Sequence, residues 1–282
     1  MSLTKFTAKN LMLAFVLVIG TTTSKGNVGG ISWFKDLNKA SEVANKTNQP
    51  MMIEFWADWC EACKVMEDDV YNDPKVVAAV NDKVIPVRIH FDLQKDLAQK
   101  YNVPALPYLV FTTSNGTELM HHRGTLEAAD LTALIKAFPS DVSQLNRLDR
   151  ALEADKNDFE SLMAMGRELR AASFLESSNR YYTKAIKQDA AKNNPAKRES
   201  ILMEMGLNFV DLKQSKQAVE IFEKCLKDFP QSPNRPELLL NLAHSYILAQ
   251  QNAKARKSLL MLIEAFPQSE ASYKAQALMK SL

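Results

Sequence analysis

Two cysteines separated by two residues, Cys60 and Cys63, are the side chains in this sequence best placed for redox chemistry. They follow the apolar run 51–56, which predicts a short buried strand, and a helical pattern begins directly after Cys60. A helix N-terminus presents unpaired N–H groups and the positive end of the helix dipole, and both stabilise a thiolate. The spacing therefore predicts thiol–disulfide exchange, in which Cys60 attacks and Cys63, one turn further along, releases the partner.

Two other uses of a Cys-x-x-Cys pair are a structural disulfide and half of a zinc site. A structural zinc ion takes four ligands, and the sequence holds no second cysteine pair. The third cysteine, Cys225, falls on a helix-packing position, which predicts a buried thiol. His121 and His122 point to opposite faces of a predicted strand, so they do not converge on an ion. We therefore expect no metal and no cofactor beyond the redox-active Cys60–Cys63 disulfide or dithiol.

Strand and helix patterns alternate around the cysteine pair over residues 33–140. Apolar residues at helical spacing from Trp33 to Ala44 predict a helix before the first strand. The Asn-Gly step at 115–116 predicts a hairpin. The remaining patterns predict helices after Cys63 and over 73–80, 95–101 and 127–138, and strands over 84–89, 108–112 and 118–122. This order indicates an α/β domain whose mixed sheet is flanked by helices.

The second half of the chain, residues 141–282, shows only helical spacing and a repeat on a template of about 34 residues, with successive copies offset by 40 and 37 residues. Small residues mark where two helices approach closely, and large residues fill the space between them. The three copies read Met165, Gly166, Leu169, Ser178, Tyr182, Ala185; then Met205, Gly206, Phe209, Ala218, Phe222, Cys225, Pro230; then Leu242, Ala243, Tyr246, Ala255, Leu259, Leu262, Pro267. We expect a helix over 145–154 to cover the first copy and one over 271–282 to close the last.

Residues 50–138 resemble the thioredoxin superfamily, and within it the carboxy-terminal thioredoxin-like domain of the bacterial transmembrane thiol:disulfide interchange reductase. The resemblance is carried by Ala57-Asp58-Trp59-Cys60-Glu61-Ala62-Cys63-Lys64, by Asn72-Asp73-Pro74 and by the Leu106-Pro107 step. Residues 145–282 resemble tetratricopeptide repeats (TPR), which stack as antiparallel helix pairs. The resemblance implies an α/β thioredoxin-like domain at 33–140 followed by an all-α TPR-like helical repeat domain at 141–282.

The thioredoxin resemblance also implies roles for five residues. Cys60 is the expected nucleophile and Cys63 the resolving thiol, with Trp59 beside them. Pro107, at the family's cis-proline position, is expected next to the cysteine pair. Glu54 stands where thioredoxins place a buried acid, which implies that it relays the proton of Cys63. Glutamate instead of aspartate departs from the family, and the other interpretation of Glu54 is an acid at a strand edge with a salt-bridge partner.

The dipeptide between the cysteines, Glu61-Ala62, bears on the direction of exchange. A carboxylate beside Cys60 disfavours its thiolate, and no histidine is present there as a cationic stabiliser. The sequence therefore favours a reducing couple over an oxidising one.

Composition and the N-terminus bear on location. With 35 basic and 33 acidic side chains, the net charge of +2 gives no reason to expect nucleic acid or an anionic membrane as partner. Lys5 and Lys9 precede an apolar run over 11–19 and a small polar run, the order of a secretory signal. We expect a signal peptide at 1–24 and a flexible leader at 25–32; an amphipathic or buried first helix is the alternative. Export, with the bacterial periplasm as the expected compartment, suits a disulfide.

These observations favour an exported thiol-disulfide oxidoreductase that reduces or isomerises protein disulfides. Its partners would be client proteins or a redox partner, and a protein or peptide in the groove of the repeats. Membrane contact is expected only through an uncleaved signal. The alternative is an interaction or adaptor protein in which the thioredoxin-like half is a scaffold or redox sensor. A thiol peroxidase is a weaker third possibility, because that chemistry's supporting Thr and Arg are not apparent.

Overall fold

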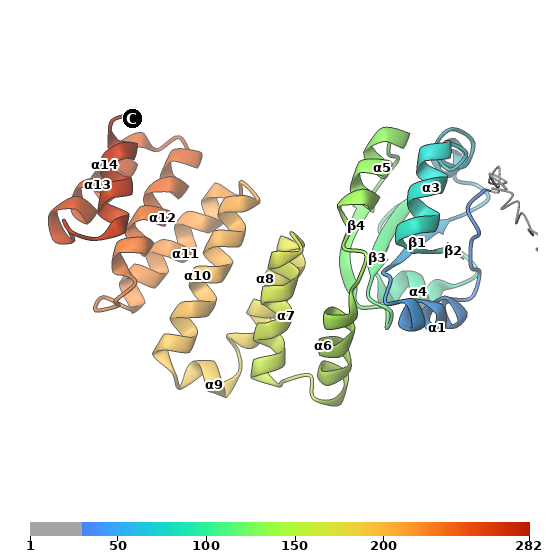
Figure 1. Cartoon of the computed structure of the whole chain (residues 1–282), viewed down its shortest axis with the longest axis horizontal. Coiled ribbons are helices and arrows are strands. Elements are labelled where there is room, and N and C mark those ends of the chain that lie inside the picture. The colour runs from blue at the N-terminus through green and yellow to red at the C-terminus, as the bar shows by residue number, and fades with distance from the viewer. Residues whose placement is uncertain (1–29) are drawn as a thin grey trace, which may run out of the picture.

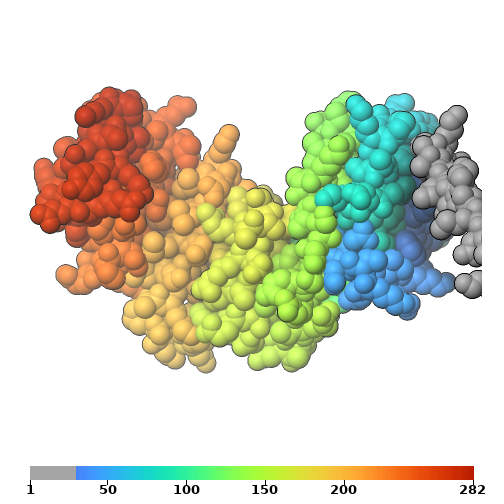
Figure 2. Space-filling view, in the orientation of Figure 1, coloured from blue at the N-terminus to red at the C-terminus, as the bar shows by residue number. Residues whose placement is uncertain are grey.

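The computed structural model describes residues 30–282, so the predicted signal peptide and most of the predicted leader lie outside the described residues. Figure 1 shows an α/β domain at one end of the molecule and an array of paired helices that extends from it. The surface is continuous across the junction and is hollowed between the domain and the far end of the array (Figure 2). Within 30–282, no helix has both the length and the apolar character needed to span a membrane.

The α/β domain is built on a four-stranded mixed sheet in the order β2-β1-β3-β4. The strands are β1 (Met51–Trp56), β2 (Ile85–His90), β3 (Tyr108–Thr112) and β4 (Glu118–Arg123). β1 pairs in parallel with β2 and antiparallel with β3, and β3 pairs antiparallel with β4. This architecture confirms the predicted mixed sheet, and the register places Glu54 of β1 directly opposite Arg88 of β2.

Helices cover both faces of the sheet. As a result, the side chains of β1 and β3 are buried on both faces. The helices are α1 (Leu37–Thr47), α2 (Glu61–Val65), the π-helical turn η1 (Met66–Val70), α3 (Pro74–Lys83), α4 (Lys95–Lys100) and α5 (Ala128–Ala137). The first helix was predicted to begin at Trp33, which is wrong. Asp36 caps α1 by accepting the N–H groups of Asn38 and Lys39, and Phe34 pairs with β2 at Val87.

The second half is entirely helical in the described residues, as predicted. Its helices are α6 (Ser143–Ala154), α7 (Phe159–Ala171), α8 (Leu175–Ala185), α9 (Asp189–Lys192), α10 (Pro195–Asp211), α11 (Ser215–Asp228), α12 (Arg235–Leu248), α13 (Asn252–Ala265) and α14 (Glu270–Met279). A Cβ atom on Gly166 would lie 2.4 Å from the Tyr182 ring, and one on Gly206 would lie 2.5 Å from Phe222. The small and large positions of the predicted repeat therefore meet inside each helix pair.

The α/β domain and the first repeat share one hydrophobic core. The Phe138 ring lies 4.4 Å from that of Phe111 in β3 and 4.9 Å from that of Phe174, just before α8. Buried Asp149 of α6 accepts hydrogen bonds from the hydroxyls of Thr113 and Thr117, at 2.7 and 2.6 Å. Apolar and polar contacts thus fix the start of the helical array against the sheet.

Candidate active site

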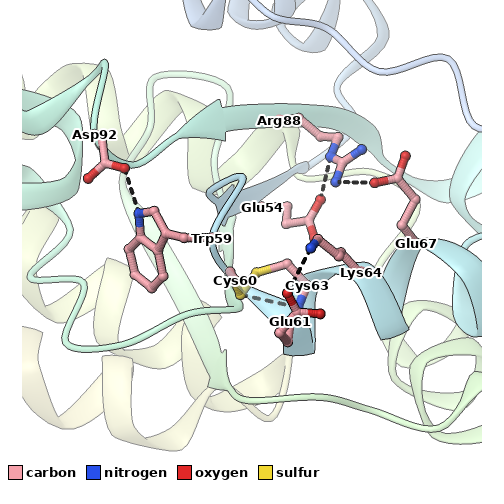
Figure 3. Close-up of a disulfide and its surroundings, with 9 residues drawn as sticks. All are labelled: Glu54, Trp59, Cys60, Glu61, Cys63, Lys64, Glu67, Arg88 and Asp92. Carbon is pink, nitrogen blue, oxygen red and sulfur yellow. Dashed lines mark hydrogen bonds and ion pairs between the residues drawn. A yellow bond between two sulfur atoms is a disulfide. The ribbon is translucent and has the colours of Figure 1, made fainter.

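The two cysteines form a disulfide at the start of α2, with their Cα atoms 5.3 Å apart (Figure 3). Cys60 is the N-cap of α2, and its Sγ accepts the Cys63 N–H at 3.1 Å. Its carbonyl accepts the N–H groups of Cys63 and Lys64 at 3.0 and 3.3 Å. The predicted position of Cys60 at a helix N-terminus is therefore confirmed, and a backbone donor is aimed at its sulfur.

The disulfide is almost covered by its surroundings. Cys60 is 5% exposed and Cys63 is 2% exposed. Phe91 and Leu106 pack against the pair, and the Leu106-Pro107 peptide bond is cis, as expected from the family position. Little of the pair is therefore open to a visiting thiol or disulfide, and slightly more of Cys60 than of Cys63 is exposed.

Trp59 projects from the loop that precedes the disulfide. Its side chain is 62% exposed, and its Nε1–H donates to Asp92 Oδ2 at 2.7 Å. Figure 3 shows the indole to one side of the disulfide, held by Asp92. An exposed aromatic ring with a fixed orientation provides apolar contact area next to Cys60 at little entropic cost.

Glu54 lies on β1 inside the sheet and is fully buried. Its Oε2 is 2.8 Å from Arg88 Nε, an ion pair across the β1–β2 register (Figure 3). The Arg88 guanidinium in turn lies 4.6 Å from the centre of the Trp56 ring and 3.2 Å from Glu67. The strand-edge interpretation of Glu54 is therefore wrong, whereas the salt-bridge partner that it included is present.

Burial raises the pKa of Glu54 from 4.5 to about 7, although the positive charge of Arg88 acts in the opposite direction. Burial, together with the negative charge of Glu54, also raises the pKa of Tyr71 well above its usual value. Glu54 is thus an acid whose two protonation states are both populated near neutral pH. Such a group is suited to accept and return a proton.

Glu61, the carboxylate next to Cys60, is paired with Lys64 one turn along α2. The Lys64 Nζ to Glu61 Oε1 distance is 2.7 Å, and both side chains are largely exposed. The lysine offsets part of the negative charge that the sequence places beside the Cys60 sulfur. Glu61 therefore disfavours the Cys60 thiolate less than an unpaired carboxylate would.

Three residues near the disulfide were not singled out from the sequence. Arg88 neutralises Glu54, Asp92 holds Trp59, and His90 lies with its Nε2 3.1 Å from Asp58 and its ring edge-on to Trp56. A signal was available for one of them, because Arg88 is a charged residue inside the predicted apolar strand 84–89. Their partners depend on a strand register that the sequence pattern does not contain.

The remaining candidate residues lie away from this site. Cys225 is fully buried in α11, as predicted, and burial raises the pKa of its thiol to about 12. His121 stacks on Tyr108 and approaches Glu118, while His122 approaches the Thr125 carbonyl. Among residues 30–282, no three His, Cys, Asp or Glu side chains form a group that could hold a metal ion.

Comparisons with known proteins find a matching family model in each half of the chain. A family model described as a thioredoxin-like domain matches residues 37–139, and one described as a tetratricopeptide repeat matches 209–279. The thiol:disulfide interchange protein DsbD of Salmonella typhimurium is 33% identical over 112 residues, which are 38% of this chain and 19% of that protein. DsbD of Photorhabdus laumondii is 28% identical over 129 residues, which are 43% of this chain and 22% of that protein.

The chain thus spans about a fifth of the length of these curated relatives. Among solved structures, the Neisseria meningitidis DsbD c-terminal domain in the oxidised form is 24% identical with a TM-score of 0.33, over 37% of this chain and 97% of that one. At that TM-score the structural likeness adds nothing to the sequence matches. The chain combines a thioredoxin-like domain, similar in sequence to part of DsbD, with a following set of tetratricopeptide repeats.

Proposed function

We propose that this protein is an exported thiol-disulfide oxidoreductase that reduces or isomerises disulfides of other proteins. The observation that carries the proposal is the Cys60–Cys63 disulfide at the N-terminus of α2, with a buried acid, Glu54, on the adjacent strand. Sequence similarity to thiol:disulfide interchange proteins supports it.

In the proposed reduction, the Cys60 thiolate attacks one sulfur of a client disulfide, and the other client sulfur leaves as a thiolate. Cys63 then loses its proton to Glu54 and attacks the Cys60 sulfur, which expels the second client thiolate. The client gains two electrons, and the protein ends with the Cys60–Cys63 disulfide seen here. A second dithiol protein must reduce that disulfide before the next cycle.

We propose a reducing rather than an oxidising direction, because Glu61 places a carboxylate next to Cys60 in the sequence, and Lys64, the nearby lysine of α2, is already paired with Glu61. A reduction potential near that of strong periplasmic oxidants, about −120 mV, would contradict this direction. Equilibration of the purified protein with glutathione buffers measures it directly.

We assign the TPR repeats to binding a client or a redox partner. The shared core between the first repeat and the sheet supports this role, because a partner bound on the array stays at a fixed place relative to the disulfide. Export to an oxidising compartment such as the periplasm is proposed from the signal-like sequence at 1–24. Cell fractionation of the full-length protein tests it, and retention in the cytoplasm would contradict it.

Insulin reduction with a dithiol donor tests the activity. We expect turnover by the native protein, none by Cys60→Ser, and unchanged turnover by Cys225→Ala, which removes the remote buried thiol. If the native protein shows no turnover while Cys60→Ser binds partners fully, the protein is an adaptor whose thioredoxin-like half is a scaffold.

A further inference from the structure

A groove is lined by residues of α11, α12 and α13. These helices lie in the part of the array that is distant from the α/β domain (Figure 1). The volume of the groove is about 460 Å³, within the range of sites that hold a small ligand or a few side chains. A slot of this size suits a peptide segment better than the flat surface of a folded domain.

The floor of the groove is apolar. Leu239, Leu242 and Tyr246 of α12 form it and are themselves nearly buried. Met261 of α13 also lines it and is 41% exposed, and the next residue in the chain, Leu260, which is not part of the lining, is 50% exposed. Large apolar side chains exposed at the edge of an apolar slot indicate a surface that a ligand's apolar residues can cover.

The rim of the groove is basic. Four cationic side chains line it: Lys227, Arg235, Lys254 and Lys257. In the described part of the chain, none of the four has an acidic oxygen within 4.0 Å. Glu223 is the one acidic residue in the lining, and its carboxylate accepts the Tyr246 hydroxyl. The groove therefore presents uncompensated positive charge around an apolar floor.

A second groove of the array and the α/β domain do not share this excess of positive charge. A similar groove beside α6 and α8 has three lysines but also two carboxylates, those of Asp149 and Glu153. Residues 30–140 carry 15 acidic against 11 basic side chains. The overall net charge of +2 thus hides a local basic site in the last repeat.

We propose that this groove binds an acidic peptide segment of a partner protein. Aliphatic or aromatic side chains of the segment would lie on the leucine floor, and its carboxylates would pair with the four rim cations. The proposal specifies the partner-binding role assigned above to the repeats, and it does not depend on the cysteine chemistry.

Selection of displayed random peptides on the full-length protein tests the proposal. We expect the enriched peptides to combine Asp or Glu with Leu or aromatic residues, and their affinity to fall as salt rises. Synthetic versions should bind Lys254→Glu/Lys257→Glu at least about tenfold more weakly. Both lysines are exposed, so this variant should keep its fold, which circular dichroism verifies.

The matched control is Lys216→Glu/Lys280→Glu, which changes the net charge equally at exposed positions outside the groove. It should bind the peptides like the native protein, and all variants should keep the native rate of insulin reduction. Enriched peptides without acidic residues, no enrichment at all, or unchanged binding by Lys254→Glu/Lys257→Glu would overturn the proposal. Self-association of the protein that the same variant abolishes would assign the groove to a second copy instead.

Discussion

Glu54 is a buried carboxyl whose protonation is linked to folding. Its pKa is near 4.5 in the unfolded chain and about 7 in the folded protein, because burial disfavours the charge. The stability that it contributes is therefore complete below pH 4.5 and is lost as the pH rises through 7. At 1.36 kcal/mol per pKa unit, the loss approaches about 3 kcal/mol.

We predict that Glu54→Gln removes this pH dependence. The variant mimics the protonated acid, so at acidic pH, where native Glu54 is also uncharged, the two proteins should have similar stability. Between pH 4.5 and 8 the native protein should lose stability relative to the variant, because only the native protein carries the buried carboxyl that ionises over this range. Urea unfolding at several pH values measures it, and parallel curves for the two proteins would contradict the assigned pKa.

The same residue should control the second step of exchange. If Glu54 takes the Cys63 proton, Glu54→Gln should slow release of a mixed disulfide by about tenfold or more at pH 7 and remove the inflection near pH 7 from the rate profile. Glu67→Gln is the matched control, because Glu67 also contacts Arg88 but is largely exposed. Equal rates for the native protein and Glu54→Gln would limit Glu54 to a structural role.

For single residues, the sequence predicts the features that depend only on neighbouring positions in the chain. Cys60 and Cys63 are three residues apart, so the strand, the helix start and the spacing predict their placement together. The Glu54–Arg88 pair joins residues on two strands, and it depends on the parallel register of β1 and β2. Composition and periodicity do not encode that register, so the cation that offsets the acid was missed.

Glycines at the helix crossings of the repeats set how closely paired helices approach. A Cβ atom at Gly206 would lie 2.5 Å from the Phe222 ring, which is fully buried in α11. We predict that Gly206→Ala destabilises the protein by about 1–3 kcal/mol through overpacking. Gly30→Ala is the control, since no atom lies within 4 Å of its Cβ position. Thermal unfolding compares the two variants. If Gly206→Ala were as stable as Gly30→Ala, the paired helices could move apart to accept the methyl group without loss of stability.

At the scale of the elements, periodicity predicted every strand and the paired helices of the repeats, because each buries one side of a regular pattern. The predicted start of α1 at Trp33 was wrong for a physical reason. Trp33 continues the helical spacing, yet the next residue, Phe34, pairs with Val87 in the sheet, and Asp36 supplies the helix cap. A long-range backbone contact overrode the local pattern.

The junction between the two halves ties the whole molecule together. Asp149 of α6 accepts from Thr113 and Thr117 at the tip of the β3–β4 hairpin, and all these groups are buried or half-buried. We predict that Asp149→Ala, although it lies in the helical half, destabilises the α/β domain by about 1–3 kcal/mol, because two hydroxyls lose their buried acceptor. Hydrogen exchange of β3 and β4 should quicken; unchanged protection there would contradict the coupling.

The sequence predicted the two halves of the molecule, but not that they share a core. The contacts across the junction join residues more than 30 positions apart, and each half shows a complete pattern by itself. The sequence also did not predict the basic groove between α11 and α13, because the net charge of the chain, +2, is close to zero and does not show how charges are distributed on the surface.

The central claim is that Cys60 attacks and Cys63 resolves. Mass spectrometry of Cys63→Ala after incubation with a disulfide-bonded client tests it most directly. We predict a stable mixed disulfide at Cys60, with none accumulating on the native protein or on Cys60→Ala. Failure of Cys63→Ala to form the adduct, or an equal yield on Cys63 in Cys60→Ala, would contradict the assignment.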